Sequence, residues 1–220
     1  EDGIRDYKVT GVQTCALPIW YRTRNRAGMW ADGKFPAHLV EEIYDLQDAL
    51  VCAQFLMSFI RNADVVKVAN LAQIANVIAP VLTKDDKLLR QTIFEALAMF
   101  VGRRAGNSLR LGYSGPVVPS PEFDSVAMLD GAAILSEGNE LYVFAVNRST
   151  EANVELTVEL SGSHLEPVSC DLLHHSDPTT QNTWDNPDSV RRSQIEMSSG
   201  LSPVIELPPH CLVAMTLKVS

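Results

Sequence analysis

The spacing of apolar residues changes once along this chain, near residue 105, and this change limits the possible folds more than any other feature. Before it, apolar side chains recur every three or four residues, as on one face of an α-helix. After it, they recur every second residue, as on one face of a half-buried β-strand. The chain is long enough for one large domain or two small ones. We therefore predict a helical part followed by a part built from antiparallel strands.

The first amphipathic helix is predicted from Leu39 to Ile60. Its apolar stripe consists of residues at spacings of four and three, namely Leu39, Ile43, Leu46, Leu50, Ala53, Met57 and Ile60. Glu41 and Glu42 suit its first turn, because the helix dipole favours negative charge there. The segment 62–64 is expected to end it.

A β-branched segment, Val65–Leu71, follows this helix, and its weak alternation predicts a strand buried on both faces. A second helix is predicted from Asp85 to about Arg104, with Gly102 and Gly106 as stop signals. Its inward stripe is Leu89, Ile93, Ala96 and Phe100. The helix–strand–helix order is typical of a parallel α/β unit. Because one such unit cannot close a sheet, we expect it to be the end of a larger domain.

The second half has the pattern of an antiparallel sheet. Ala127–Leu135 and Leu141–Val146 are predicted to form a hairpin with a tight turn at residues 137–139, which read Glu-Gly-Asn. Two further strands alternate apolar and polar residues, with apolar positions at Val154, Leu156, Val158 and Leu160 and at Cys211, Val213, Met215, Leu217 and Val219. Several short strands separated by turns favour an antiparallel sandwich or barrel.

Charge and composition exclude several classes of protein. The formal charge is −9 and the arginine pairs at 103–104 and 191–192 are isolated, so no nucleic-acid surface is expected. No apolar run approaches the roughly 18 residues of a membrane span. Cys52, Cys170 and Cys211 are widely spaced, which favours buried free thiols in a reducing compartment, the cytoplasm. We expect neither a cofactor nor a membrane partner.

Residues 1–19 differ in character from the rest of the chain. They resemble the in-frame translation of a sequencing-library adapter, with Tyr7 and Lys8 at the index position. The alternative, a genuine leader, fits poorly, because charged residues interrupt the region before its short apolar stretch. We expect residues 1–19 to be a non-native leader and exclude them from the predicted fold.

Three groups of motifs resemble glycoside hydrolase family 51, and they occur in the same order along the chain. The first group is Trp20-Tyr21-Arg22 with the sequences Ala-Gln-Phe-Leu at 53–56 and Arg-Asn-Ala-Asp at 61–64. The second is Val-Ala-Asn-Leu-Ala-Gln at 68–73 with Asn-Val-Ile-Ala-Pro at 76–80. The third is Phe-Ala-Val-Asn-Arg-Ser at 144–149, Asn-Thr-Trp-Asp-Asn-Pro at 182–187 and Glu-Leu-Pro-Pro at 206–209.

This resemblance implies an α/β plus all-β fold: the last part of a (β/α)8 barrel followed by an antiparallel β-sandwich. Residues 20–106 would be the C-terminal part of the barrel and residues 107–220 the sandwich domain. The implied enzyme is a retaining, exo-acting α-L-arabinofuranosidase. It would remove terminal non-reducing arabinofuranosyl groups from arabinoxylan- or arabinan-type polysaccharides. Members of the family are often homo-oligomers, so the same is expected of the parent enzyme.

The resemblance fails at the catalytic carboxylates. Retaining hydrolysis needs two carboxyl groups about 5–5.5 Å apart. The nucleophile of the family lies in an Asp-Glu-Trp-Asn-Val-Trp-Tyr segment, of which only Trp20 and Tyr21 occur here, and Ala16 occupies the nucleophile position. The acid/base Glu of the family is expected upstream of this sequence. We therefore expect no catalytic residue in this chain and no activity of the chain alone.

Gln73 and Trp20 are the predicted substrate-binding residues. Gln73 follows the predicted strand at its C-terminal end, and the resemblance matches it to a Gln that binds the sugar next to the scissile bond. The alternative is a polar side chain that satisfies the local backbone. Trp20 matches a Trp that lines the cleft, and the alternative is a core Trp.

Other residues are expected to be structural. His174 and His175 with Asp177 do not predict a metal site, because adjacent residues on a strand point to opposite faces. The glycosylation pattern at 147–149 is expected to be a strand end. A competing hypothesis is a non-catalytic carbohydrate-binding module, which needs a row of exposed aromatic side chains. The candidates in the strand half are Tyr113, Phe123, Tyr142, Phe144 and Trp184.

Overall fold

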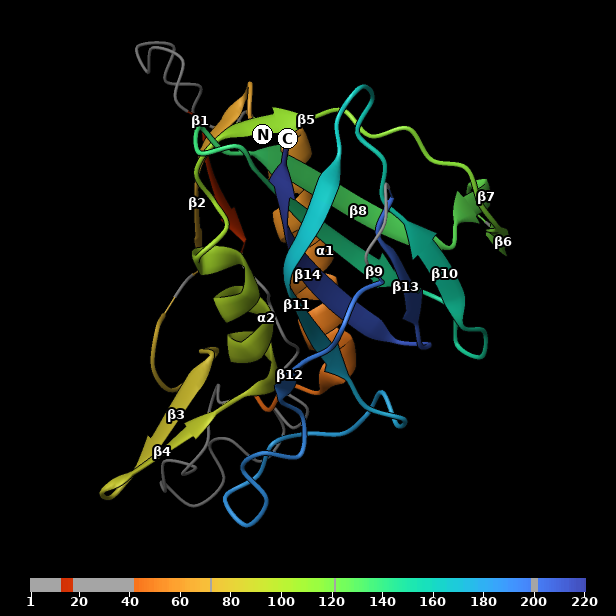
Figure 1. Ribbon diagram of the computed structural model, residues 1–220. Helices are drawn as coiled ribbons and strands as arrows, with labels where there is room; N and C mark the ends of the chain where they lie inside the picture. Colours follow the sequence, from red (N-terminus) through yellow and green to blue (C-terminus); the bar gives the residue numbers. More distant parts are fainter. Residues whose placement is uncertain (1–12, 18–41, 72, 121, 199–201) are drawn as a thin grey trace.

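The protein is built around one antiparallel sheet of six strands (Figure 1). The computed structural model describes residues 13–17, 42–71, 73–120, 122–198 and 202–220. Across the sheet, the strands lie in the order β12 (Arg192–Gln194), β11 (Leu165–His174), β14 (Cys211–Val219), β9 (Glu140–Asn147), β8 (Leu129–Leu135) and β5 (Asn107–Leu109). The longest strands, β11, β14 and β9, occupy the centre, where most of the core residues lie.

The two faces of this sheet are covered by different elements. Even-numbered residues of β8, β9 and β14 face helices α1 (Leu46–Arg61) and α2 (Thr92–Val101), and odd-numbered residues face a ribbon of β10 (Val154–Thr157) and β13 (Val204–Leu207). In β14, for example, Leu212 and Ala214 lie in the core between the sheet and the helices. Val213 and Met215 lie in the core between the sheet and the β10–β13 ribbon. The period-two pattern thus distributes apolar side chains to two cores.

The hairpin predicted around residues 137–139 is confirmed. Strands β8 and β9 pair antiparallel, with Leu135 opposite Leu141, and the Ser136 N–H donates to the carbonyl oxygen of Glu140 at 2.8 Å. Asn139 takes the left-handed backbone conformation at φ 58° that Asn tolerates better than most residues. The predicted C-terminal strand is also confirmed as β14. The antiparallel sheet is therefore as expected, and the second layer among the described residues is the two-stranded β10–β13 ribbon.

Helix α1 begins later than predicted. Residues 42–45 are not helical, and Asp45 is the N-cap, with the Asp48 N–H donating to its carboxylate at 3.1 Å and the Asp45 N–H donating to the Asp48 carboxylate at 3.0 Å. This reciprocal capping box fixes the first turn. The prediction that Ile43 belongs to the apolar stripe is wrong, because Ile43 lies before the helix and is 55% exposed. Leu39 and Glu41 lie outside the described residues.

The prediction that the second helix begins at Asp85 is wrong. Residues 81–90 form a β-hairpin, β3 (Val81–Lys84) and β4 (Lys87–Arg90), and α2 begins only after Gln91. Asp85 has a φ of 54°, which turns the chain between the two strands. Leu89 is buried as expected but reaches the core from β4, four residues before Ile93 on α2.

Strand β2 (Val66–Leu71) forms where predicted, but it is not buried on both faces. Its four central residues are exposed. Among the described residues, its one partner is β1 (Gln13–Leu17), which runs parallel to it with Ala16 opposite Asn70. This strand lies within the leader that the sequence excluded from the fold. Among the described residues no second strand pairs with β2, and helix α1 contacts it while leaving its central residues exposed.

Helix α2 is joined to the sheet across the predicted domain boundary at residues 106/107. The rings of Phe100 and Phe144 stack with centroids 4.1 Å apart and an interplanar angle of 8°. Beyond the end of α2, the Arg103 guanidinium donates to the Asp171 carboxylate at 2.7 Å and to the Thr216 hydroxyl at 2.9 Å. One apolar core thus includes residues from both sides of the boundary, and the division at 106/107 stays a prediction.

Two smaller features complete the described part of the chain. Strands β6 (Val117–Ser120) and β7 (Asp124–Ala127) form a separate ribbon that projects from the sheet (Figure 1). The segment 175–191 between β11 and β12 packs against α1 and β4, because the Leu46 N–H donates to the Thr180 carbonyl oxygen at 3.1 Å and the Asn182 amide donates to the Arg90 carbonyl oxygen at 3.0 Å.

All three cysteines predicted as free buried thiols are confirmed as such. Burial, with a smaller effect of the Asp48 carboxylate, raises the pKa of Cys52 from 9.0 to about 11. Burial likewise raises the pKa of Cys170 and of Cys211 to about 12. Each thiol is at most 3% exposed, so ionisation requires the local structure to open.

These thiols predict a loss of stability at alkaline pH. The folded state keeps its thiol protons above pH 9 while the unfolded state releases them, so the free energy of unfolding falls as pH rises. The stability is fully present below pH 9, and each thiol should remove about 1.4 kcal/mol per pH unit above it. Urea unfolding at pH 8, 9 and 10 under reducing conditions measures this fall. Cys52→Ala should flatten the slope, and an unchanged urea midpoint from pH 8 to 10 would contradict the assignment.

Candidate functional site

Gln73 lies two residues beyond the C-terminal end of β2, as the sequence predicted. Its side chain is exposed, and no hydrogen-bond partner of that side chain is found among the residues that the structure describes. Its φ of 59° turns the chain sharply at this point. The position suits a side chain that reaches toward a ligand above the end of the strand.

The loop that carries Gln73 is held in place by the β3–β4 hairpin. The Asn76 N–H donates to the Val81 carbonyl oxygen at 2.7 Å, and the Thr83 N–H donates to the Asn76 side-chain oxygen at 2.8 Å. Asn76 and Val77 both have positive φ, 59° and 61°. These bonds position the backbone that follows Gln73, and they depend on a hairpin whose second strand, β4, falls within the predicted helix.

The structure places Ala16 on the strand next to the one that precedes Gln73. Ala16, at the nucleophile position of the resembled family, lies on β1 opposite Asn70 of β2, close to the end of β2 that precedes Gln73. Because the two strands are parallel, their carboxyl ends meet at one edge. Trp20 lies outside the described residues.

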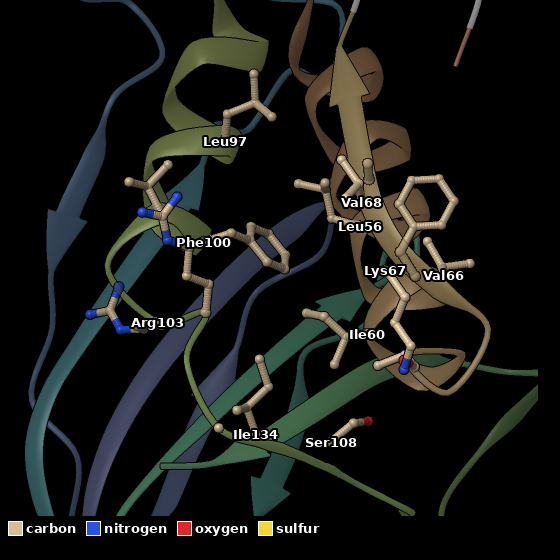
Figure 2. A pocket seen from close by; sticks show the side chains of 16 residues that line it. Leu56, Ile60, Val66, Lys67, Val68, Leu97, Phe100, Arg103, Ser108 and Ile134 are labelled. Atoms are coloured by element: carbon tan, nitrogen blue, oxygen red, sulfur yellow. The ribbon is translucent and has the colours of Figure 1, made fainter. Parts of the chain in front are cut away.

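An apolar groove with a volume of about 510 Å³ lies between α1, β2 and α2. Figure 2 shows Leu56 and Ile60 of α1, Val66 and Val68 of β2 and Leu97 of α2 lining it, with Ile134 of the sheet at its base. Branched aliphatic side chains offer no hydrogen bonds to hydroxyl groups. Lys67, Arg103 and Arg104 also line the groove, so charged side chains lie beside the apolar ones between the strand and its flanking helices.

Two asparagines from the motifs have structural roles. The side-chain amide of Asn147, fully buried at the end of β9, donates to the carbonyl oxygens of Leu207 and Pro208 at 3.0 and 2.9 Å. The expected strand-end role of this residue is thus confirmed. Asn182 donates to the Val190 carbonyl oxygen at 3.1 Å and accepts from the Val190 N–H at 2.8 Å, which closes the loop between them.

The histidine pair lies at the end of β11. His174 is the last residue of the strand, and the Nδ1 atom of His175 accepts a hydrogen bond from the Asp177 N–H at 3.1 Å. Hydrogen bonds from Thr179 hold the pKa of Asp177 below its ordinary value. Among the residues that the structure describes, no three His, Cys, Asp or Glu side chains gather as a metal site. Nor does the described part contain a helix long and apolar enough to cross a membrane.

Gln91 is the site-supporting residue that the sequence analysis missed. It is 1% exposed, and its amide joins three separate segments. Its oxygen accepts from the Tyr44 N–H at 3.0 Å, and its nitrogen donates to the carbonyl oxygens of Glu42 and Ala79 at 3.0 and 2.7 Å. These partners lie up to 49 residues away, so no local sequence pattern marks them.

Comparison with known proteins identifies the family. Residues 19–210 match the family described as the α-L-arabinofuranosidase C-terminal domain, so residues 1–18 lie outside the match. The "Intracellular exo-alpha-(1->5)-L-arabinofuranosidase" of Streptomyces lividans is 34% identical over 175 residues, which is 78% of this chain and 26% of that protein. The protein named "Intracellular exo-alpha-(1->5)-L-arabinofuranosidase 1" of Bacillus subtilis is 34% identical over 194 residues, covering 86% of this chain and 37% of that protein.

Solved structures agree with this assignment. The family 51 α-L-arabinofuranosidase of Bifidobacterium longum superposes with a TM-score of 0.76 at 27% identity, over 81% of this chain and 35% of that one. The GH51 arabinofuranosidase of Xanthomonas axonopodis pv. citri gives a TM-score of 0.75 at 25% identity, over 85% and 38%. The chain thus spans between about a quarter and two fifths of these proteins. It belongs to the family 51 α-L-arabinofuranosidases, of which it contains the C-terminal domain.

Proposed function

We propose that this chain is the C-terminal part of a retaining, exo-acting α-L-arabinofuranosidase that removes terminal non-reducing arabinofuranosyl groups from arabinoxylan- or arabinan-type polysaccharides. Family membership and the printed names of the relatives support this proposal. Residues 20–106 would form the end of the (β/α)8 barrel and residues 107–220 the β-sandwich domain. The buried free thiols and the relatives named intracellular support a cytoplasmic location.

The observation that carries the proposal is the α1–β2–α2 unit with Gln73 beyond the end of its strand. Strand β2 pairs in parallel with β1, and its Val68 is 42% exposed, although parallel strands are normally covered on both faces. The groove beside it is lined mostly by apolar side chains, together with Lys67, Arg103 and Arg104. These features support a barrel whose remaining strands and helices cover this face in the parent enzyme.

The chemistry of the proposed site requires groups that this chain lacks. A retaining mechanism needs one carboxylate to attack the sugar and one carboxylic acid to protonate the leaving oxygen. Ala16, at the nucleophile position, has a methyl side chain without a lone pair. Gln73 would bind rather than react, because its amide both donates and accepts hydrogen bonds from sugar hydroxyl groups.

The proposal predicts that the 220-residue chain has no activity alone. Incubation with 4-nitrophenyl α-L-arabinofuranoside should release 4-nitrophenol no faster than buffer, because no pair of carboxylates is assembled around the sugar. Far-UV circular dichroism of the same sample confirms that the chain is folded. Hydrolysis by the folded chain that is abolished by a substitution in the chain itself would contradict the proposal that the catalytic carboxylates are missing.

The role of Gln73 is testable in a hybrid enzyme. Residues 20–220 would be joined behind the N-terminal part of the S. lividans relative, which replaces the leader. Gln73→Ala in this hybrid should lower kcat/KM by about ten-fold to a hundred-fold, since the lost hydrogen bonds to the sugar are worth about 1.4–2.8 kcal/mol. Gln47→Ala, at an exposed position of α1, should leave kcat/KM unchanged. If the Gln73→Ala hybrid had the same kcat/KM as the unsubstituted hybrid, Gln73 would have no role in binding the sugar.

A subunit-contact role for the sandwich is compatible with this function. We propose a homo-oligomeric parent enzyme, and the projecting β6–β7 ribbon offers apolar surface for such contacts, with Val117 57% and Phe123 68% exposed. Light scattering of the hybrid measures its mass directly. A monomeric hybrid with full activity would contradict the oligomer proposal and leave the catalytic one intact.

A further inference from the structure

A second, more polar groove lies at the opposite end of β2 from Gln73. It has a volume of about 430 Å³ and is lined by Arg61, Ala63, Asp64, Ser108, Leu109, Arg110, Leu111 and Tyr113. We call it the Tyr113 groove. The end of α1 and the segment before β2 form one wall, and β5 with the residues after it forms the other. Its volume lies in the range of small-molecule sites, about 300–1,000 Å³.

One wall of the Tyr113 groove is held rigid at a single backbone carbonyl. The Tyr113 hydroxyl donates to the carbonyl oxygen of Gly131 at 2.8 Å, and the Arg61 guanidinium donates to the same oxygen at 2.6 Å. Arg61 also donates to the Asp130 carboxylate at 2.9 Å. Both lining side chains are therefore fixed before any ligand arrives, which lowers the entropy lost on binding.

Gly131 makes this arrangement possible. A Cβ atom at this position would lie 2.9 Å from the Phe144 carbonyl oxygen and 3.2 Å from the Tyr113 hydroxyl. The first distance is too short for a backbone contact, so a larger residue would displace the strand or the ring. Tyr113 remains 52% exposed although its hydroxyl is held, so part of its surface is available to a ligand.

The groove also contains two charged side chains that have no assigned role. Asp64 and Arg110 are exposed, and within the described ranges neither side chain has a hydrogen-bond or ion-pair partner. A carboxylate accepts and a guanidinium donates paired hydrogen bonds, the pattern that neighbouring hydroxyl groups of a sugar can match. Arg61 is paired with Asp130, and Arg148 adds a positive charge near Tyr113. The exposed Asp64 carboxylate in the lining disfavours an anion and leaves a neutral ligand as the better match.

We propose that the Tyr113 groove binds one unit of a neutral oligosaccharide, with the sugar against Tyr113 and its hydroxyl groups bonded by Asp64 and Arg110. The groove is near the start of β2, whereas Gln73 lies beyond its end, a separation of about 20 Å for six strand residues. It is therefore a separate binding site for the polysaccharide chain. The choice of arabinose as the sugar rests on the proposed function. The proposal that the groove binds a neutral sugar does not depend on it.

The test is an NMR titration of the 220-residue chain with α-1,5-linked arabinotriose. Saturable shifts are expected at the amides of residues 61–64 and 108–113. Tyr113→Ala and Arg110→Ala should each weaken binding at least ten-fold, whereas Tyr113→Phe, which keeps the ring, should bind within about three-fold of the parent. Gln47→Ala on α1 and Phe123→Ala, an exposed aromatic outside the groove, are matched controls that should bind normally. Circular dichroism checks the fold of each variant.

Several results would overturn the proposal. These are no saturable binding of arabinotriose, binding unaffected by Tyr113→Ala and Arg110→Ala in folded variants, or amide shifts that fall outside residues 61–64 and 108–113. Displacement of arabinotriose by inorganic phosphate would indicate an anion site instead. Tighter binding of xylotriose would keep the groove as a neutral-sugar site but contradict its assignment to arabinose. Turnover of the hybrid enzyme tests the proposed function separately, because the groove variants are measured by binding to the chain alone.

Discussion

Phe144→Ala should lower the free energy of unfolding by about 3–5 kcal/mol, the usual range for removing a large buried aromatic side chain. Phe144 lies on β9 with no exposed surface, and its ring stacks on Phe100 of α2 at 4.1 Å. Its removal leaves a cavity between the sheet and the helix and also removes the aromatic contact. Urea unfolding followed by circular dichroism measures the change.

Two further variants separate burial from the aromatic contact. Phe123→Ala removes the same side chain from a position that is 68% exposed, and it should change the free energy of unfolding by less than about 0.5 kcal/mol. A double-mutant cycle of Phe100→Ala and Phe144→Ala should show a coupling of about 0.5–1.5 kcal/mol. A Phe144→Ala loss no larger than that of Phe123→Ala would mean that α2 does not pack on the sheet as described.

Gln91→Ala should lower the free energy of unfolding by about 3 kcal/mol, because it removes three hydrogen bonds to buried or half-buried backbone groups, each worth about 1 kcal/mol. The Tyr44 N–H loses its acceptor, and the Ala79 and Glu42 carbonyl oxygens lose a donor. The segment before α1 and the loop before β3 are then no longer tied to the start of α2. Chemical denaturation gives the size of the effect, and hydrogen exchange at the Tyr44 amide locates it.

The chain offers matched controls for Gln91. Gln47→Ala removes the same side chain from an exposed position of α1 and should cost less than about 0.5 kcal/mol. Gln91→Glu keeps the shape and the acceptor for Tyr44 but replaces the donor by a second acceptor, so it should destabilise at least as much as alanine. If Gln91→Ala left the free energy of unfolding unchanged, water would replace the amide, and the hydrogen bonds of Gln91 to the other segments would not contribute to stability.

The strand half was predictable because its signal is local. Strands β9 and β14 are apolar on both faces, and a residue's odd or even position decides which of the two cores its side chain enters. The turn between β8 and β9 needs a residue that accepts positive φ, and Asn139 supplies it. The layer that covers the second face was not specified by the sequence, because β10 and β13 pair across about 50 residues of intervening chain.

The helix starts were predicted poorly because apolar spacing does not distinguish a helix from a strand that leads into one. Leu89 and Ile93 are four residues apart and both buried, yet Leu89 belongs to β4. The capping box of Asp45 with Asp48 marks the true start of α1, and α2 begins at Thr92, after the hairpin that turns at Asp85. Two acidic residues form that box, in place of the Ser or Thr with Glu that a sequence search looks for.

The position of the candidate site could be predicted from the sequence, but the hydrogen bonds that hold its loop in place could not. Gln73 follows β2 as expected, while its sugar-binding role and that of Trp20 stay predictions. The bonds between Asn76 and Thr83 that fix its loop arise from the β3–β4 hairpin, and the Gln91 ties join residues far apart in the chain. Such contacts depend on the folded arrangement and leave no periodic pattern in the sequence.

The central claim is that this chain supplies one end of an arabinofuranosidase and that the catalytic carboxylates come from the part of the enzyme before it. The most direct test compares the 220-residue chain with the hybrid of residues 20–220 on 4-nitrophenyl α-L-arabinofuranoside. The account predicts hydrolysis by the hybrid, inhibited by arabinose, and none by the chain alone. Hydrolysis by the chain alone, or a folded hybrid without any hydrolysis, would contradict it.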